Sequence, residues 1–406
     1  MPSLKTLLPT TILLPSLALA AAPPTIIRTQ SASTIPNSWI ARLDNDSPFD
    51  DILASVLFTA GVESKANYTI NSVKGFAFDG DDSVLDILET LSGIVHVEPD
   101  TKVYASVPVQ CRDVAPFANG SLVTQNGSTW GLARLSHEEP GVNEYIYDSS
   151  AGEGSYIYVI DTGIYTEHSE FGGRATFGQN FIDDEDTDGQ GHGTHCAGTA
   201  AGTKYGVAKK ANLIAVKVLG SDGSGSNSGV LKGIDWAVNH AKQNNHIDRT
   251  VLSMSLGGPF SQLTNDAIAE AVAEGAFVAV AAGNENEDAS NSSPASTPQA
   301  CTVAASTSSD ERASFSNYGP LVDIFAPGED ILSSWIGSPS ATNTISGTSM
   351  ACPHVAGLAA YLIGLEGPRE PESLCGRIQE LALKGVLEGV GRGTVNALAQ
   401  NGVAAK

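Results

Sequence analysis

Three segments of the chain carry residues that together could perform nucleophilic catalysis. Asp161 follows an apolar run of five residues, His192 lies in a Gly-His-Gly-Thr-His segment, and Ser349 lies in a Gly-Thr-Ser-Met-Ala segment. A serine hydroxyl becomes a nucleophile when a histidine takes its proton, and an aspartate can orient that histidine and stabilise its cation. The three residue types therefore predict acyl-transfer chemistry, with Ser349 as nucleophile, His192 as base and Asp161 as orienting acid.

The elements around these residues are predicted to form an α/β fold with a parallel sheet flanked by helices. Short runs that are apolar on both faces suit strands buried on both sides. The strand candidates are Tyr156–Ile160, Leu213–Leu219, Val251–Leu256, Phe277–Ala282 and Val322–Phe325. The helix candidates between them are His192–Gly202, Val230–Lys242, Thr264–Glu274 and Thr348–Leu365. Because ligands bind at the carboxyl ends of such strands, Asp161 is placed where chemistry is expected.

A small α+β unit is predicted to precede this fold, over residues 36–106. Its strand candidates are Ser38–Leu43, Gly75–Phe78 and Ile94–Val97, and its helix candidates are Asp50–Phe58 and Asp82–Leu91. From residue 107 the periodicity is lost and Pro, Asn, Gly and Ser accumulate, so residues 107–122 are assigned to a linker. Residues 1–20 combine Lys5, an interrupted apolar stretch and the ending Ala-Leu-Ala, which predicts a secretory signal and not a membrane anchor.

The order of the three catalytic candidates is Asp, His, Ser, which is the order in subtilisin. An α/β-hydrolase would need an acid and then a histidine after its nucleophile, and no Asp follows Ser349. An aspartic protease would need a second Asp-Thr-Gly or Asp-Ser-Gly besides Asp161-Thr-Gly, and the sequence has neither. From about residue 36 to its end, the chain resembles the subtilisin-like serine proteases of the proteinase K type, which fungi secrete as precursors.

This resemblance implies a signal peptide at residues 1–20, an inhibitory propeptide at 21–122 with its folded part at 36–106, and a protease domain at 123–406. It also implies that Asn284 donates its amide to the oxyanion, together with the backbone N–H of Ser349. Two chain edges and the segment before Asn284 are expected to bind an extended substrate. The residues implied are Gly223, Ser224, Gly225, Ser255, Leu256, Gly257, Ala281, Ala282 and Gly283.

For metals, the resemblance implies one structural calcium site, made by the Asp323 carboxylate and the carbonyls of Pro298 and Ala300. A second family site needs an aspartate near position 386, where this chain has Val386, so that site is expected to be absent. No organic cofactor is expected.

Two other motifs are set aside. Residues 184–189 begin like an EF-hand loop, but the twelfth position is His195 and not Glu, so a solvated acidic loop is expected. The pair His192 and His195 has a metal-ligand spacing without the Glu of a zincin, so His195 is expected to be structural.

The five cysteines form an odd set, so at least one lacks an intramolecular partner. The resemblance pairs Cys301 with Cys375. Cys196 and Cys352 each lie one helical turn after a predicted catalytic residue and are expected to be free thiols, with a Cys196–Cys352 bridge as the alternative. Cys111 falls in the linker and would be lost on maturation.

The charge of the chain limits its partners. Lys+Arg 22 against Asp+Glu 45 give a net charge of −23, which argues against binding to nucleic acid or to an anionic membrane surface. Export would permit glycosylation at N-x-[ST] sequons. These lie at Asn45, Asn67, Asn119, Asn126 and Asn291.

Together these features predict a secreted, monomeric serine endopeptidase of broad specificity that acts on proteins and processes its own precursor. The propeptide would lay its tail across the active site, and self-cleavage would fall near Leu122. The clefts contain no charged residue that obviously selects a charged side chain, and the resemblance implies broad cleavage after aliphatic or aromatic residues. The alternative is a non-enzymatic secreted binding protein, which would require a broken triad or oxyanion hole.

Overall fold

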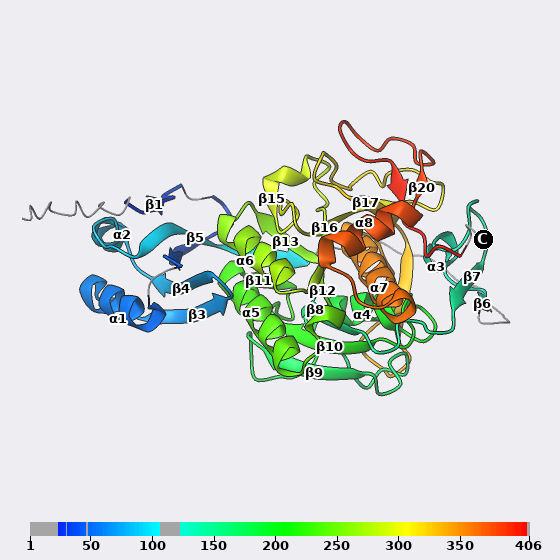
Figure 1. The fold of residues 1–406 in the computed structure, drawn as a ribbon, viewed down its shortest axis with the longest axis horizontal. Helices are drawn as coiled ribbons and strands as arrows, with labels where there is room; N and C mark the ends of the chain where they lie inside the picture. Colours follow the sequence, from blue (N-terminus) through cyan, green and yellow to red (C-terminus); the bar gives the residue numbers. More distant parts are fainter. Residues whose placement is uncertain (1–22, 30, 46–47, 106–121, 404–406) are drawn as a thin grey trace, which may run out of the picture.

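The computed structural model describes residues 23–29, 31–45, 48–105 and 122–403. The expected signal peptide, Cys111 and Asn119 lie outside these residues. The described chain forms two parts that pack side by side, a small N-terminal unit and a larger α/β body (Figure 1).

A nine-stranded sheet forms the centre of the α/β body, in the order β20-β21-β17-β16-β14-β12-β8-β10-β9. All neighbouring pairs are parallel except β20 with β21. The strands are β8 (Tyr156–Asp161), β9 (Ala175–Asn180), β10 (Asn212–Lys217), β12 (Thr250–Met254), β14 (Phe277–Ala281), β16 (Cys301–Ser306), β17 (Ile324–Pro327), β20 (Leu383–Lys384) and β21 (Ala397–Leu398). The predicted α/β class with a parallel sheet is confirmed.

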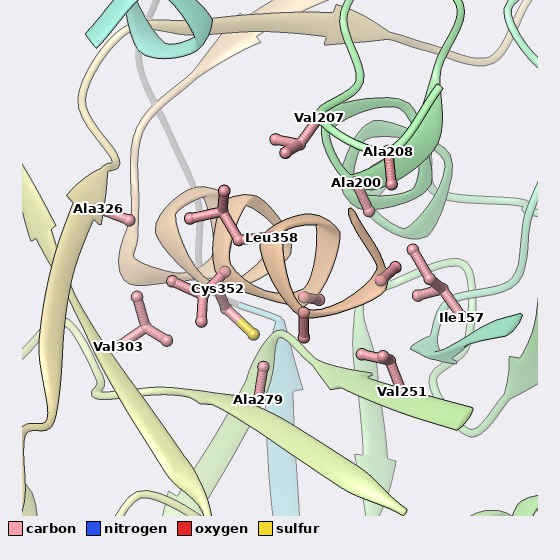
Figure 2. Close-up of a cluster of buried hydrophobic side chains, with 14 of the residues drawn as sticks. Ile157, Ala200, Val207, Ala208, Val251, Ala279, Val303, Ala326, Cys352 and Leu358 are labelled. Atoms are coloured by element: carbon pink, nitrogen blue, oxygen red, sulfur yellow. The ribbon is translucent and has the colours of Figure 1, made fainter. Parts of the chain in front are cut away.

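Helices cover both faces of this sheet. Successive residues of β8 point to opposite faces: Ile157 and Val159 pack into one core cluster, and Tyr158 and Ile160 into another. Helices α4 (His192–Ala201) and α7 (Thr348–Glu366) lie against the first face, and α5 (Asn227–Gln243) and α6 (Gln262–Ala273) against the second. Figure 2 shows Cys352 of α7 facing Ala279 of the central strands.

Helix α7 is the one described helix long and apolar enough to cross a membrane. However, 89% of its most apolar 18-residue window is buried inside the protein. Its apolar character is therefore accounted for by its place in the core, between the central strands and α4.

The remaining elements of the body are short or peripheral. They are β6 (Leu122–Asn126), α3 (Trp130–Arg134), β7 (Glu144–Asp148), β11 (Ser224–Ser226), η1 (Ile247–Arg249), β13 (Leu256–Pro259), η2 (Ala289–Asn291), β15 (Ser292–Ser293), β18 (Ile331–Ser334), β19 (Thr342–Ile345) and α8 (Pro371–Leu381). Strand β6 begins one residue before the predicted boundary at 123 and pairs with β7.

The N-terminal unit is a sheet with two helices on one face. Its elements are β1 (Thr25–Ile26), β2 (Thr34–Leu43), α1 (Phe49–Ala60), β3 (Ser64–Ile70), β4 (Val73–Asp79), α2 (Asp82–Leu88) and β5 (Ile94–Ala105). The predicted strands and helices are all present, whereas β1 and β3 were not predicted. Side chains of α1 and α2 fill one side of the sheet. The other side packs on α5 and α6 of the body, where Tyr68 and Ile70 join the core of those helices.

Strand β5 links the two parts, because it is much longer than the predicted Ile94–Val97. Its first half pairs with β2. Its second half runs antiparallel between two edges of the body, β11 on one side and β13 on the other. The segment that ends at Ala105 therefore completes a mixed sheet across the boundary between the two parts.

Candidate active site

Asp161 and His192 meet at the carboxyl edge of the central sheet. Asp161 is the last residue of β8 and His192 the first of α4. The Nδ1 of His192 lies 2.8 Å from Oδ1 and 3.0 Å from Oδ2 of Asp161, and both side chains are fully buried. Burial alone would lower the pKa of His192, but the adjacent Asp161 carboxylate outweighs it, so the pKa lies well above its usual value. The pair can hold a proton on the imidazole.

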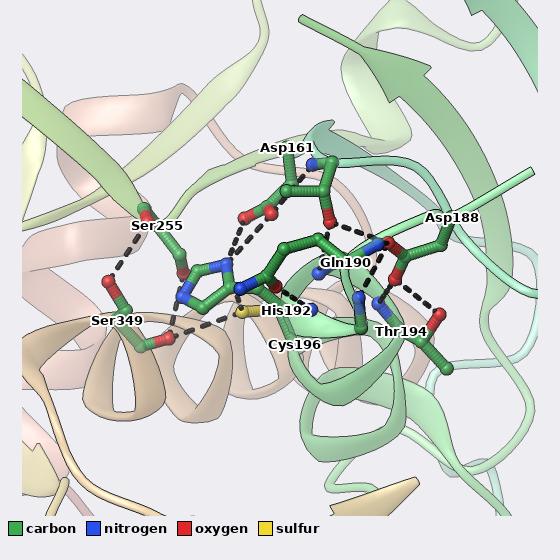
Figure 3. A network of polar contacts seen from close by, with 11 residues as sticks. Asp161, Asp188, Gln190, His192, Thr194, Cys196, Ser255 and Ser349 are labelled. Atoms are coloured by element: carbon green, nitrogen blue, oxygen red, sulfur yellow. Dashed lines mark hydrogen bonds and ion pairs between the residues drawn. The ribbon is translucent and has the colours of Figure 1, made fainter. Parts of the chain in front are cut away.

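Ser349 is the second residue of α7 and lies on the other side of the imidazole (Figure 3). Its hydroxyl donates to the backbone carbonyl of Ser255 at 2.9 Å. The Nε2 of His192 is buried and has no hydrogen-bond partner among the described residues. A rotation of the Ser349 side chain from the Ser255 carbonyl toward Nε2 would complete an Asp–His–Ser relay, and such bonds are often open before substrate binds.

Pro353 lies inside α7, beyond the first turn in which a missing backbone N–H costs least. In a regular helix the amide of residue 353 would donate to the carbonyl of Ser349. That carbonyl instead accepts from the Ser255 hydroxyl at 2.8 Å and from the Cys196 thiol at 3.4 Å. The proline thus leaves an acceptor that ties α7 at Ser349 to Ser255, which lies between β12 and β13, and to Cys196 of α4.

Asn284 follows β14 and lies beside the start of α7. Its side-chain oxygen accepts from the backbone N–H of Thr348 at 2.8 Å and from the Thr348 hydroxyl at 3.0 Å. With the oxygen held in this way, the amide hydrogens remain available as donors. Gly283 before it has a φ of 101°, a conformation that glycine adopts without strain.

Asp188 was predicted to lie in a solvated loop, and this was wrong. Its side chain is buried and accepts five hydrogen bonds. The donors are the Thr162 hydroxyl, the backbone N–H groups of Gln190, Gly191 and Thr194, and the Thr194 hydroxyl. Thr162 follows Asp161, and the other donors flank His192, so Asp188 fixes the two candidate catalytic segments to each other (Figure 3). The acidic residues around Asp188 led to the prediction of a solvated loop. Its position only four residues before His192 was the one sign in the sequence that it could support the site.

The groove beside Ser349 is occupied by the end of β5. Tyr104 is opposite Ser224 on one side and Gly257 on the other, and Ala105 is opposite Leu256. The backbone N–H of Ala105 donates to the carbonyl of Gly223 at 3.0 Å. The expected substrate edges therefore lie on either side of one extended strand, and that strand belongs to the chain itself.

A pocket of about 440 Å³ adjoins this strand. Its walls include Leu256 and Gly257 from β13 and Ala281, Gly283 and Asn284 from the β14 segment. Two glutamates also line it, Glu285 and Glu287. The pocket thus contains charged residues that the sequence motifs did not point to, and Glu285 directly follows Asn284 in the sequence. Ala282 is fully buried and is not among the residues that line this pocket.

The cysteines are placed as follows. Cys301 and Cys375 form a disulfide with a Cα–Cα distance of 5.8 Å. Cys196 and Cys352 are buried and form no disulfide within the described part of the chain. The sulfur of Cys196 lies 3.8 Å from Nδ1 of His192, and burial raises the pKa of Cys352 to about 12. Both are therefore thiols in the core next to the candidate site.

Asp323 directly precedes β17, and its carboxylate lies close to the Cys301–Cys375 disulfide. Its Oδ2 accepts from the backbone N–H of Thr302 at 2.8 Å, and burial raises its pKa to about 6. No described cation lies within ion-pair distance of this carboxylate. A hard, oxygen-binding ion such as Ca²⁺ fits an uncompensated carboxylate. The adjacent cysteine sulfurs are bonded to each other and offer no thiolate.

Four sequons lie among the described residues. Asn45, Asn67 and Asn291 are exposed and Asn126 is half-buried. Asn291 also lines the pocket described above.

Comparisons with known proteins agree with this arrangement. The model of the Subtilase family matches residues 152–393. The chain is 49% identical over 365 residues to Subtilisin-like protease 2 of Pseudogymnoascus destructans, covering 88% of this chain and 86% of that one. It is 45% identical over 402 residues to the cuticle-degrading protease of Metarhizium anisopliae, covering 98% and 99%.

A solved structure is also similar. The crystal structure of a cold adapted subtilisin-like serine proteinase matches with a TM-score of 0.64 and 42% identity, over 68% of this chain and 98% of that one. With the family model, the curated relatives and this fold in agreement, the chain belongs to the subtilase family and is a serine endopeptidase.

Proposed function

We propose that the chain is the precursor of a secreted endopeptidase that cleaves proteins through Asp161, His192 and Ser349. The observation that supports this most strongly is the buried Asp161–His192 pair beside Ser349, at the end of a groove that holds an extended strand. Secretion rests on the signal-like residues 1–20. Broad specificity rests on the edges β11 and β13, since they pair with backbone and not with particular side chains.

In the proposed mechanism, His192 Nε2 takes the proton of the Ser349 hydroxyl as that oxygen attacks the carbonyl carbon of the scissile peptide bond. The oxyanion that forms accepts from the Ser349 backbone N–H and the Asn284 amide. The start of α7 adds its partial positive charge at the same point. Asp161 stabilises the imidazolium and keeps Nδ1 protonated.

The second half of the reaction uses the same groups. His192 gives its proton to the leaving amine, the C–N bond breaks, and the acyl group remains on Ser349 as an ester. A water molecule then attacks this ester while His192 takes its proton. The ester C–O bond breaks, the carboxylic acid leaves, and the proton returns to Ser349.

We further propose that residues 21–122 are the inhibitory propeptide and 123–406 the mature enzyme, with self-cleavage near Leu122. Support comes from β5, which occupies the groove and also reaches the two helices beneath it. Asp100 accepts from the N–H and hydroxyl of Ser228 in the first turn of α5, at 3.2 and 2.6 Å. Glu98 accepts from Ser261, the N-cap of α6. Carboxylates are favourable at helix N-termini.

Replacement of Ser349 tests this proposal. Ser349→Ala should abolish both peptide hydrolysis and release of the propeptide, because both need the same nucleophile. Secreted protein should then keep the mass of the unprocessed precursor. Ser346→Ala, three residues upstream on the same chain, should process normally. Hydrolysis or propeptide release by purified Ser349→Ala protein would contradict the proposal and favour a non-catalytic role for the triad.

We also propose one structural calcium, held by Asp323 with the carbonyls of Pro298 and Ala300. Its chemistry would be charge neutralisation of the buried carboxylate. Calcium should raise the thermal unfolding midpoint of the wild type, and this rise should disappear in Asp323→Asn. A calcium response that survives this substitution would place the ion elsewhere.

A further inference from the structure

We infer that Asp188 is a positioning residue for the proposed Asp–His pair, and that it acts through Thr162. The inference rests on the proposed triad and adds two residues that touch neither the substrate nor the reacting atoms. It gives a reason for the burial of an acidic side chain beside the site, although no described cation lies within ion-pair distance of its carboxylate.

Asp188 determines how helix α4 begins. The N-cap of this helix is Gly191, which has no side chain to bond the first turn. The Asp188 carboxylate takes that role, because it accepts from the backbone N–H of Gly191 at 2.8 Å and from that of Thr194 at 2.9 Å. A negative charge is favourable at a helix N-terminus. Since His192 is the first residue of α4, the same contacts also fix the proposed base.

Thr162 joins this carboxylate to the segment that carries the proposed acid. It directly follows Asp161, and its backbone N–H donates to Oδ1 of Asp161 at 2.7 Å. Its hydroxyl donates to Asp188 at 2.9 Å and accepts from the backbone N–H of Gly193, the residue after His192, at 2.9 Å. One residue therefore bonds the acid, the carboxylate of Asp188 and the helix of the base.

The two segments are in close contact at this point. A Cβ atom on Gly193 would lie 2.1 Å from the carbonyl oxygen of Gly163 and 3.2 Å from Cβ of Asp161. No side chain fits in that space, so backbone contact sets the distance between the segments. A displacement of either segment would change the distance from Nδ1 of His192 to the Asp161 carboxylate, which is 2.8 Å.

The loop that carries Asp188 is also anchored beside Asp161 through its first residues. Lys217, the last residue of β10, is paired with Asp161 in the central sheet and is 1% exposed. Its ammonium group donates to the Asp183 carboxylate at 2.8 Å and to the carbonyl of Glu185 at 3.0 Å. Both ends of the loop are therefore attached next to the proposed acid, which makes the loop a firm support for Asp188.

The role requires a carboxylate and not only a side chain of that shape. The two oxygens of Asp188 accept five hydrogen bonds, and a carboxylate offers no donor that could repel those N–H and O–H groups. An asparagine amide has one accepting oxygen, and its NH₂ group would face groups that also donate. Asp188→Asn should therefore loosen both segments while it keeps the size of the side chain.

The first test measures the rate of the processed enzyme on a peptide substrate. Asp188→Asn should lower kcat by about 10- to 100-fold with KM little changed, because the groups it displaces act in the transition state. Thr162→Val, which lacks the hydroxyl, should also lose rate, whereas Thr162→Ser, which keeps the hydroxyl, should retain most of it. Since the two residues act as one unit, the double variant Thr162→Val/Asp188→Asn should cost no more than Asp188→Asn alone.

A pH profile separates positioning from a loss of folded protein. Burial lowers the pKa of His192, and the adjacent Asp161 carboxylate outweighs this effect. When Asp188→Asn lets the pair separate, the pKa should fall, so the acid limb of kcat/KM should move to lower pH. The other titratable groups beside the imidazole, Cys196 and His195, lie on α4 with it. A smaller folded fraction would instead scale the activity and leave the limb in place.

Asp184 provides the matched control. It lies in the same loop, is exposed and has no hydrogen-bond partner among the described residues. Asp184→Asn makes the same change of charge and should match the wild type in rate and pH profile. An equal loss in Asp184→Asn, additive losses in the double variant, or a normal kcat in Asp188→Asn would each overturn the inference.

A measurement on the precursor covers variants that are too slow to process themselves. In Ser349→Ala protein, proton NMR should show the Nδ1–H of His192 far downfield, because it is hydrogen-bonded to a carboxylate. Adding Asp188→Asn or Thr162→Val should move this signal upfield, and Thr162→Ser should not; an unmoved signal in the first two would contradict the inference. This readout needs no catalysis, so a wild type without peptidase activity would refute the proposed function, whereas the NMR result alone decides the positioning role.

Discussion

At the scale of single residues, the candidate site depends on a few side chains. In each of them one polar group is held by a neighbouring residue, and another polar group stays free to act on the substrate. The carboxylate of Asp161 holds Nδ1 of His192, which leaves Nε2 for the nucleophile. Thr348 holds the oxygen of Asn284, which leaves the amide hydrogens for an oxyanion. The types of these residues could be predicted from short motifs. The role of Asp188 could not, because it depends on five hydrogen bonds from two segments, Thr162 and residues 190–194, that only the fold brings together.

The proposed oxyanion role of Asn284 leads to a prediction about the catalytic rate. Asn284→Ala should lower kcat by about 10²- to 10³-fold, the usual cost of losing one such donor, with KM little changed. The reason is that the amide acts on charge that develops only in the transition state. Steady-state kinetics on a peptide substrate measures both constants. Asn239→Ala, on the exposed surface of α5, is the control and should match the wild type. A variant with a normal kcat would remove Asn284 from the mechanism.

At the scale of elements, sequence patterns located most of the central strands and helices because their apolar runs are long and buried on both faces. The sequence patterns gave wrong strand bounds where hydrogen bonding to a neighbouring strand decides the structure. Val251–Leu256 was predicted as one strand, but β12 ends at Met254 and β13 begins at Leu256, so Ser255 is freed to bond Ser349. The second half of β5 contains polar residues and becomes a strand because β11 and β13 supply its hydrogen bonds.

The position of β5 between β11 and β13 leads to a prediction about inhibition of the mature enzyme by its propeptide. Val103 is 1% exposed and packs among core residues of α5 and the central strands. Val103→Asp in an isolated propeptide, if that propeptide inhibits the mature enzyme in trans, should weaken inhibition by 100-fold or more, because a carboxylate would be buried without a partner.

The control lies on the same strand. Val95 is 41% exposed, so Val95→Asp should leave the inhibition constant unchanged. Equal inhibition by both variants would show that β5 does not occupy the groove in solution.

At the scale of the whole molecule, the sheet gathers the site from segments nearly 190 residues apart, and two further histidines are buried in the core around it. His195 donates Nε2–H to the carbonyl of Ile331, and His354 lies within hydrogen-bond distance of the carbonyl of Met350. Burial lowers the pKa of His195 to about 3 and that of His354 to about 4. Both are therefore neutral in the folded protein near pH 7.

These depressed pKa values give stability a pH dependence. In the unfolded chain each histidine has a pKa of about 6.5, so below that pH the unfolded state binds more protons than the folded state. The free energy of unfolding should therefore fall as pH drops from about 6.5 toward 4, by about 1.4 kcal/mol per pH unit for each histidine. Unfolding midpoints of Ser349→Ala protein, which cannot digest itself, would measure this loss.

A second variant assigns part of that slope to one residue. His354→Gln in the Ser349→Ala background removes one titrating group and keeps a side-chain donor for the Met350 carbonyl. Its stability should decline less steeply between pH 6.5 and 4, by about one proton. Identical slopes for the two proteins would mean that His354 does not contribute.

The central claim is that Ser349 is a nucleophile activated by His192. The most direct measurement is the intact mass of the secreted, processed enzyme before and after a serine-directed sulfonyl fluoride, followed by mapping of the labelled peptide. We predict one adduct per molecule, located on Ser349 and formed in step with the loss of activity. Label on another residue, or full activity in protein whose Ser349 is labelled, would contradict the account.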